Sequence, residues 1–362
     1  MFDLDKILRR NIKNLTPYSS ARGEFKGKEG VFLDANENSF GDPISNLKSQ
    51  ISNLNRYPDP LQLDLKEKLS QIKGVPVENI FIGNGSDEAI DILFRAFCDP
   101  RKDNVIVCPP TYGMYEVSAN INDVEARKVN LLENFQLDIE KISETISPFG
   151  GGKEGATKLI FICSPNNPTG NSMNRKDIEI VLNNFEGLVV IDEAYINFAK
   201  QKTFINELME YPNLVILQTL SKAWGLAGLR VGLAFGSQQI IDVFNKIKPP
   251  YNINAASQDL AIKALNEVDK VNSRIKEIVR EREKLAKELE KLNFILKIYP
   301  SEANFVLVKT KDAKAMYNYL IENTIVTRDR SSIALCEGCI RITVGTNEEN
   351  NKLIDTLKKY TS

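Results

Sequence analysis

The chain has 362 residues, of which 42% are hydrophobic and 26% charged, as expected for a globular protein with a sizeable core. Its 47 basic and 48 acidic side chains leave a formal net charge of -1, so we expect a small-molecule partner rather than nucleic acid or an acidic membrane. The absence of histidine excludes Ser-His and Cys-His nucleophile systems, and it leaves acid–base chemistry to lysine, tyrosine or a carboxylate.

The first residues, MFDLDKILRRNIKNL, mix acids and bases and lack the apolar stretch of a secretory signal. No segment approaches the roughly 18 uninterrupted apolar residues of a membrane span, so we expect a cytoplasmic protein. Cys336 and Cys339 form one CxxC motif, but neither a second pair nor a histidine exists to complete a zinc site. We therefore expect no metal, and we expect the five cysteines to serve core packing.

Short, unalternating apolar runs predict the strands of a large sheet. Such runs are rich in Val and Ile, which is typical of strands that are buried on both faces of a mostly parallel sheet. Helical patterns separate most of them, for example over 86–97 and 174–185. The sequence therefore predicts an α/β fold with helices on both faces of the sheet. The runs are 79–82, 104–108, 158–163, 188–192, 214–219 and 230–235.

A different texture begins near residue 256. Residues 271–292 predict one long amphipathic helix with alternating charges on its outer face. Strand patterns at 303–310 and 339–345, with a helix over 313–323, predict a smaller α+β domain. The expected division is an N-terminal segment over 1–30 that packs on the small domain, a large domain over 31–255 and the small domain over 256–362.

Ligands of open parallel sheets bind beyond the carboxyl ends of the strands, so the residues that follow each run sample one wall of the site. A lone acid at such a place is better explained as a helix cap, and a lone tyrosine as part of the core. Five strand ends with polar groups together predict one site. In chain order these groups are Gly85, Ser86 as the expected N-cap of the next helix, Asp87, Tyr112, Asn167, Asp192, Tyr195, Thr219, Ser221, Lys222 and Arg230.

Pyridoxal 5'-phosphate uses all of these groups at once. Its aldehyde needs a lysine amine for a Schiff base, which assigns Lys222. A buried carboxylate such as Asp192 favours a protonated ring nitrogen, and Asn167 and Tyr195 are candidates to bind the 3-oxygen. Tyr112 offers an aromatic plate for the ring. The predicted phosphate ligands are Thr219, Ser221, Arg230 and the residues at the helix start, Gly85, Ser86 and Asp87.

Three strings, SPNNPTG, DEAY and TLSKAWGLAGLR, occur in this order and resemble the fold-type I aminotransferases. Further strings resemble the histidinol-phosphate branch of that family, among them NLTPYSSAR, LDANENSFG, NRYPDP, CPPTYGMY and IRITVGT. The resemblance extends over about residues 7–358. It implies transfer of the amino group between L-histidinol phosphate and 2-oxoglutarate, giving imidazole-acetol phosphate and L-glutamate, in histidine biosynthesis.

The resemblance also implies a homodimer with shared active sites, in which Tyr57 reaches the phosphate of the partner's cofactor. It assigns Arg341, assisted by Arg328, to the phosphate ester of the substrate, a task that suits the planar guanidinium fork. Tyr18 and Asn36 would line the substrate end of the site.

Two departures from the family pattern bear on substrate preference. Asp34 stands where the family more often has asparagine, and Arg330 adds a cation beside Arg328. Three alternatives therefore stay open: an aromatic-amino-acid aminotransferase or threonine-phosphate decarboxylase on the same scaffold, a cofactor-binding regulator, and a scaffold protein without catalysis.

Overall fold

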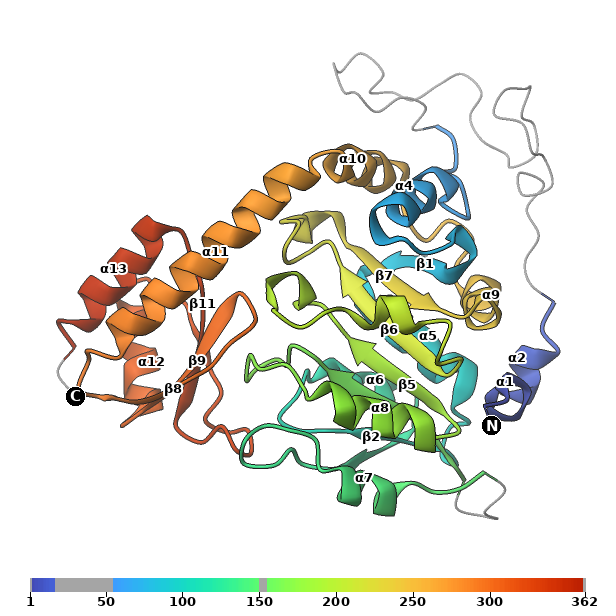
Figure 1. Ribbon diagram of the computed structural model, residues 1–362, viewed down its shortest axis with the longest axis horizontal. Coiled ribbons are helices and arrows are strands. Elements are labelled where there is room, and N and C mark those ends of the chain that lie inside the picture. The colour runs from blue at the N-terminus through green and yellow to red at the C-terminus, as the bar shows by residue number, and fades with distance from the viewer. Residues whose placement is uncertain (1, 17–54, 150–154, 361–362) are drawn as a thin grey trace.

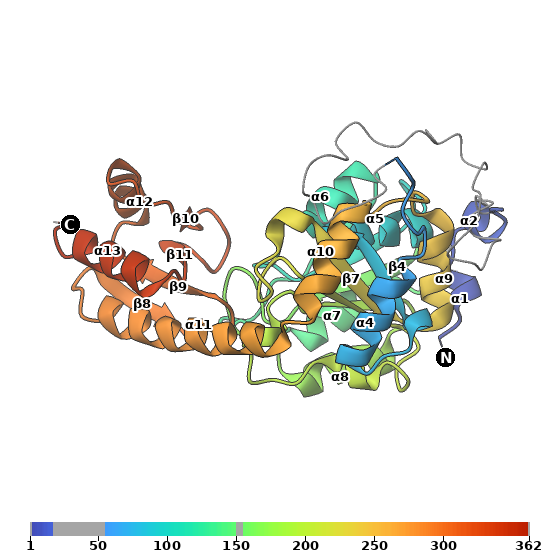
Figure 2. The ribbon, with the colours of Figure 1, turned by 90° about the horizontal axis from the view of Figure 1, so that it is seen from above.

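The computed structural model describes residues 2–16, 55–149 and 155–360. Two β-sheets of different size form separate parts of the molecule, and one long helix, α11 (Val268–Leu289), runs from the larger part to the smaller one (Figure 1). A view at right angles shows the small sheet with its helices standing to one side of the large part (Figure 2).

The large sheet has seven strands in the order β1-β7-β6-β5-β4-β2-β3. Strands β6, β5, β4, β2 and β3 are parallel to their neighbours, whereas β7 runs antiparallel to both β6 and β1. The carboxyl ends of β1, β2, β4, β5 and β6 therefore share one edge of the sheet, and β7 starts there. The strands are β1 Ile80–Asn84, β2 Asn104–Val107, β3 Glu125–Lys128, β4 Thr157–Cys163, β5 Leu188–Asp192, β6 Leu214–Thr219 and β7 Val231–Gly236.

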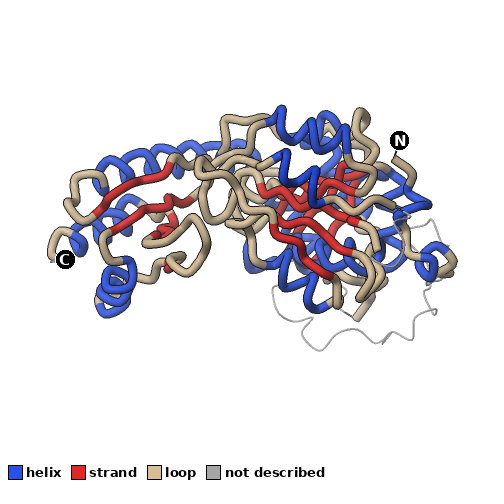
Figure 3. Tube along the Cα trace, turned by 90° about the horizontal axis from the view of Figure 1, so that it is seen from below, coloured by secondary structure: helices blue, strands red, loops and turns tan. Residues whose placement is uncertain are grey.

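Helices cover both faces of this sheet, which confirms the predicted α/β architecture (Figure 3). Alternate residues of β5 show why its run is continuously apolar: Leu188 and Val190 belong to one core, and Val189 and Ile191 belong to the other. One face carries α5 Gly85–Phe97, α6 Met114–Ile121 and α9 Gln238–Ile247. The other face carries α4 Leu63–Lys73, α7 Ile139–Thr145, α8 Arg175–Asn184 and α10 Ala255–Leu265.

The small sheet is antiparallel, with the order β10-β11-β9-β8. Its strands are β8 Ile295–Tyr299, β9 Phe305–Thr310, β10 Arg328–Asp329 and β11 Cys339–Thr343. Helices α12 (Ala313–Glu322) and α13 (Asn347–Leu357) pack with α11 against one face. The other face turns toward the large sheet, where the Phe305 ring meets the Tyr195 ring edge-on at 5.2 Å between centroids.

The N-terminal segment lies on the large part of the molecule. Helices α1 (Leu4–Ile7) and α2 (Arg10–Lys13) precede α4, and Ile7 is buried in the core formed with α5 and α9. Arg9 donates to the carbonyl of Arg95 at 2.9 Å. The expectation that the segment packs on the small domain is therefore wrong for residues 2–16, because their apolar side chains complete the core beneath the large sheet. Residues 17–30 lie outside the described part.

The sequence patterns do not predict three strands, β3, β8 and β10. All three are edge strands without a buried apolar run: β3 has the sequence EARK, β8 has half-buried and exposed residues, and β10 has only two residues. Four short 3-10 helices complete the described elements: η1 Val77–Asn79, η3 Ile196–Phe198, η4 Phe204–Glu207 and η5 Ala227–Leu229. All five cysteines are free and buried. Across the described residues, no helix has the length and apolar character needed to cross a membrane.

Candidate active site

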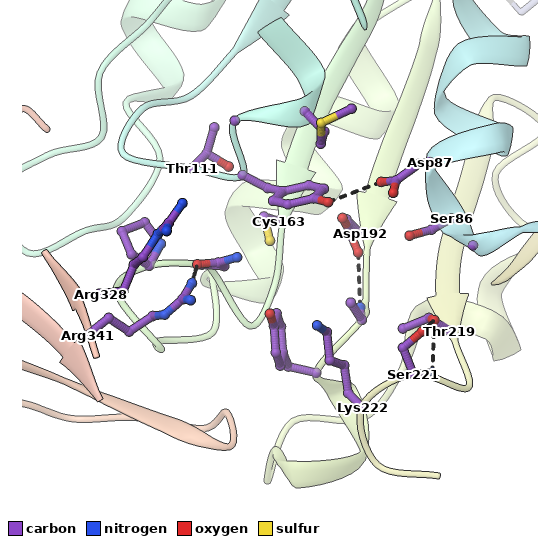
Figure 4. Close-up of a pocket in the computed structure, with 18 of the residues that line it drawn as sticks. Ser86, Asp87, Thr111, Cys163, Asp192, Thr219, Ser221, Lys222, Arg328 and Arg341 are labelled. Carbon is purple, nitrogen blue, oxygen red and sulfur yellow. Dashed lines mark hydrogen bonds between the residues drawn. The ribbon is translucent and has the colours of Figure 1, made fainter. Parts of the chain in front are cut away.

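A cavity of about 750 Å³ lies where the carboxyl edge of the large sheet faces the small sheet. Side chains from both parts of the molecule point into it (Figure 4). The structure thus brings together predicted residues that are separated by up to 256 positions in the chain. Those that line the cavity are Gly85, Ser86, Asp87, Tyr112, Asn167, Asp192, Tyr195, Thr219, Ser221, Lys222, Arg230, Arg328 and Arg341.

The turn from β1 into α5 forms one wall. Gly85 has a φ of +71° and begins α5, so the N-cap is Asn84 and the prediction of Ser86 as the cap is wrong. The Asn84 side chain makes no capping bond and donates instead to the Asn252 carbonyl at 2.5 Å, while the backbone N–H of Asn84 donates to the Glu88 carboxylate at 2.6 Å. Gly232 of β7 lies so close that a Cβ there would stand 2.0 Å from the Gly85 carbonyl carbon. The close approach of β7 to the start of α5 therefore requires glycine at position 232, and the positive φ of the turn favours glycine at position 85.

Cationic and hydroxyl groups surround this helix start. Arg230, with a φ of 54°, holds its guanidinium 3.7 Å from a carboxylate oxygen of Asp87. The Thr219 hydroxyl donates to the Ser221 hydroxyl at 3.0 Å, and the Ser221 amide donates back to Thr219 at 3.1 Å. A helix N-terminus with adjacent hydroxyls and a guanidinium suits a phosphate group.

Asp192 ends β5 and is only 3% exposed. One carboxylate oxygen accepts from the Ala194 amide at 3.0 Å, and the other accepts from the Tyr115 hydroxyl at 2.7 Å. Burial raises the pKa of the Asp192 carboxyl, which these donors partly counteract. A buried carboxylate of this kind is stabilised by a cation placed beside it.

Tyr115 is a site residue that the strand-end pattern does not predict. In CPPTYGMY the pattern points to Tyr112 alone, although the two tyrosines are three residues apart, a spacing that puts both on one side of a helix start. The structure shows them serving two different acids, because Tyr112 donates to Asp87 at 3.1 Å. The helical spacing was the available signal.

Lys222 follows β6 and lines the cavity, with its amine directed toward Asp192 (Figure 4). Its amine lies 5.7 Å from the centre of the Tyr195 ring. Burial lowers the pKa of the Lys222 amine, and the positive charge of Arg341 lowers it further. A larger fraction of Lys222 is therefore neutral, and available as a nucleophile or base, than of an ordinary surface lysine.

Arginines gather at the end of the cavity formed by the small sheet. Arg328 on β10 pairs in register with Arg341 on β11. Arg330 lies two residues after Arg328 and also lines the cavity. Arg341 donates to the side-chain oxygen of Asn167, and its guanidinium lies 5.2 Å from the centre of the Phe305 ring.

This arginine cluster, Arg328, Arg330 and Arg341, brings three positive charges together beside a single acid of the described residues, Asp329. Burial lowers the pKa of both Arg330 and Arg341, and mutual repulsion adds to the effect. Within the described ranges no ion pair joins the cluster to a carboxylate, and the buried Nε of Arg330 has no hydrogen-bond partner. The cluster is therefore suited to an anion with more than one negative charge.

Among the described residues, one predicted site residue, Tyr57, does not line this cavity. Tyr57 is exposed and stacks on Tyr251 with 4.5 Å between ring centroids. Its segment is tied down by the Lys248 amine, which donates to the carbonyls of Pro60 at 2.6 Å and Pro250 at 2.9 Å. Tyr18 and Asn36, together with Asp34, lie outside the described residues.

The described residues of the cavity do not form a metal-binding site. In the part of the chain that the structure describes, no three Cys, Asp or Glu side chains are grouped so as to hold a metal ion. The polar groups of the cavity are instead one lysine, arginines, two carboxylates and hydroxyl donors.

Comparison with known proteins relates this site to a family. The model of the family "Aminotransferase class I and II" matches residues 28–357. A histidinol-phosphate aminotransferase of Cytophaga hutchinsonii is 55% identical over 359 residues, and one of Parabacteroides distasonis is 51% identical over 358 residues, with 99% of every chain covered. A crystal structure described as a putative histidinol-phosphate aminotransferase of Erwinia carotovora superposes with a TM-score of 0.76 at 26% identity, covering 84% of this chain and 88% of the other. The chain therefore belongs to the aminotransferase class I and II family.

Proposed function

We propose that the protein is a pyridoxal-phosphate-dependent aminotransferase that acts on L-histidinol phosphate, with 2-oxoglutarate and glutamate as the second substrate pair, in histidine biosynthesis. The observation that carries the proposal is one cavity in which Lys222 and Asp192 face the same space while an arginine cluster closes the far end. The names of the relatives that are 51–55% identical over nearly the whole chain support the same assignment.

The residues present fit the cofactor. Gly85 and Gly232 leave a cradle that a Cβ would fill, and the groups around it are those that bind a phosphate. Asp192 is buried, which raises the pKa of its carboxyl, and a cationic ring nitrogen beside it would stabilise its ionised form. Lys222 would supply the amine that binds the aldehyde carbon. Tyr195 and Asn167 would bind the 3-oxygen, and Tyr112 would cover the ring.

The chain supplies its own proton carrier. With no histidine in the sequence, Lys222 is the base within the cavity whose lowered pKa fits it to take the proton from the α-carbon of the substrate. When bound, the cofactor supplies an electron-withdrawing ring that accepts the electron pair left by that proton. Arg341, held by Asn167, orients the substrate and brings its α-carbon within reach of the lysine.

The arginine cluster favours a phosphorylated substrate. A phosphate monoester carries nearly two negative charges at neutral pH, whereas the α-carboxylate of an aromatic amino acid carries only one. Arg341 and Arg328 would form the main contacts. Arg330 adds charge in the same place and strengthens the preference for a dianion.

We also propose that two copies of the chain share their active sites. Tyr57 is exposed, outside the cavity of its own chain and fixed by stacking on Tyr251. A second copy would place this tyrosine at the phosphate cradle of the first. Sedimentation of the wild type and of Tyr57→Phe, combined with cofactor affinity, tests this: the variant should stay dimeric and bind the cofactor more weakly.

A half-reaction assay separates the possible substrates. The cofactor-loaded enzyme is mixed with L-histidinol phosphate, phenylalanine, aspartate or threonine phosphate, and its absorbance is followed as the cofactor is converted. We expect the fastest conversion with histidinol phosphate. Faster conversion with phenylalanine would assign an aromatic aminotransferase, release of carbon dioxide from threonine phosphate would assign the decarboxylase, and absence of any spectral change would contradict an enzymatic role.

A further inference from the structure

Tyr115 has contacts that core packing does not require. It is fully buried in α6, and its hydroxyl donates to an oxygen of Asp192 at 2.7 Å. The second carboxylate oxygen of Asp192 accepts from the Ala194 amide at 3.0 Å. Each oxygen of the acid thus has one fixed donor on the protein side, while Asp192 still lines the cavity.

Ring contacts fix the position of the Tyr115 hydroxyl, whose second polar neighbour besides Asp192 is the Cys163 thiol of β4. The Tyr115 ring stacks on Phe161 with 4.8 Å between centroids and 15° between planes, and Phe161 stacks in turn on Phe94 at 5.5 Å. The ring of Tyr112 meets Tyr115 edge-on at 5.6 Å. Aromatic contacts on two sides therefore hold the donor in place.

The charges around Asp192 make this donor consequential. Burial raises the pKa of the Asp192 carboxyl, and the nearby carboxylate of Asp87 on α5 raises it further, so both oppose ionisation. The Tyr115 hydroxyl, the Ala194 amide and the Lys222 amine act in the opposite direction. The hydrogen bond from Tyr115 favours the ionised form more than any other group facing this acid.

We propose that Tyr115 is a positioning residue that keeps Asp192 ionised and fixes the direction of its free lone pairs, so that the carboxylate receives a protonated aromatic nitrogen of the bound cofactor. This inference rests on the proposed function, because it requires a ring whose nitrogen is cationic. Tyr115 acts through Asp192 and touches neither substrate nor cofactor.

The test compares two tyrosine variants of the cofactor-loaded protein. Tyr115→Phe keeps the stacked ring and removes the hydroxyl, and Tyr319→Phe is the matched control, because Tyr319 donates to the Thr356 carbonyl at 3.2 Å in the small part of the molecule. The dissociation constant of pyridoxal phosphate is measured by equilibrium dialysis. The pH midpoint of the visible absorbance of the bound cofactor is measured in parallel.

We expect Tyr115→Phe to weaken cofactor binding about ten-fold, the usual scale for a lost hydrogen bond to a charged group. We also expect the pH midpoint to rise, because a less cationic ring withdraws less charge from the lysine nitrogen that is bound to it. Tyr319→Phe should match the wild type in both measurements.

A double-variant cycle with Asp192→Asn shows whether Tyr115 acts through the acid. We expect Tyr115→Phe to have no further effect in the Asp192→Asn background. Equal affinity and midpoint in Tyr115→Phe and the control, or additive effects in the cycle, would overturn the inference while leaving the proposed function intact. Failure of the wild type to bind pyridoxal phosphate would overturn the proposed function itself, and the inference with it.

Discussion

The two ends of the cavity handle charge in opposite ways. At the large sheet, Asp87 accepts a hydrogen bond from Tyr112, just before α6, and Asp192 accepts one from Tyr115 within α6. Arg230 faces Asp87. At the small sheet, no ion pair joins the arginine cluster to a carboxylate among the described residues, and the neighbouring acid, Asp329, accepts hydrogen bonds from Ser331. The acids of the first end thus have donors on the protein, whereas the second end concentrates positive charge. Under the proposed function, we therefore expect cofactor retention and substrate choice to depend on different parts of the chain.

We expect the largest effect from removal of the Lys222 amine, which lies between the two ends of the cavity. Lys222→Ala should lower kcat/KM by about 10⁴-fold, because the base for the α-proton is gone. It should also abolish the cofactor that borohydride fixes to the protein, which peptide mass spectrometry measures. The exposed Lys291→Ala serves as the control. Cofactor fixed to another lysine would contradict the assignment.

The next largest effect is expected from a substitution that disturbs only the large-sheet end of the cavity. Gly232→Ala forces a Cβ to within 2.0 Å of the backbone of Gly85, so we expect a loss of about 1–3 kcal/mol in the free energy of unfolding, together with weaker cofactor binding. Gly228→Ala is the control, since a Cβ there meets nothing within 4 Å. Urea titrations give the stability. An unchanged midpoint for Gly232→Ala would mean that the turn yields without cost.

The small-sheet end is broken by Arg341→Gln. We expect kcat/KM for histidinol phosphate to fall about 100-fold, because a charged hydrogen-bonding fork is lost, while cofactor affinity stays within two-fold of the wild type. Arg101→Gln, at a highly exposed side chain, controls for loss of one positive charge. A parallel loss of cofactor affinity would show that the two ends are not separable.

Arg330→Gln sharpens the comparison by testing preference rather than activity. We expect the ratio of kcat/KM for histidinol phosphate to that for phenylalanine to fall about ten-fold, as for one charge-assisted contact. Steady-state kinetics with both substrates measures this ratio. If both values of kcat/KM fall equally, Arg330 supports the fold of the loop and not the choice of substrate.

The smallest effect links the two ends. Since Arg341 lowers the pKa of the Lys222 amine, Arg341→Gln should raise that pKa. The rate of amine acylation at Lys222 in the cofactor-free protein, followed from pH 7 to 11 by mass spectrometry, should then rise at a higher pH than in the wild type. Lys291 provides the internal reference. An unshifted profile would show that burial alone sets the pKa.

The sequence predicted best where a single physical requirement dominates. Strands β4, β5 and β6 are buried on both faces, so their runs are continuously apolar, and polar groups at their ends have to serve the site. Edge strands β3, β8 and β10 lack this requirement, and the sequence patterns do not predict them. The large-sheet site residues followed from strand ends, whereas the roles of Arg328 and Arg341 came only from the family resemblance.

Other features depend on tertiary contacts that local patterns do not encode. The N-terminal helices pack beside α5 and α9 because Ile7 fits that core, which no spacing in residues 2–16 indicates. The cap at Asn84 depends on Glu88 occupying the Asn84 amide and on Gly85 taking a positive φ. The bond from Tyr115 to Asp192 joins residues 77 positions apart.

The register between β10 and β11 determines which side of the small sheet Arg328 and Arg341 face. Ile340 and Ile342 face the small core while Arg341, between them, faces the cavity opposite Arg328. Because neighbouring strand residues point to opposite sides, deleting one residue within β11 would drive a guanidinium into hydrocarbon and expose an isoleucine instead. We therefore expect insertions in related sequences to occur in the connection from Ser331 to Gly338 and not within β10 or β11. That bias gives a way to recognise the same anion-binding end in distant sequences by strand spacing alone.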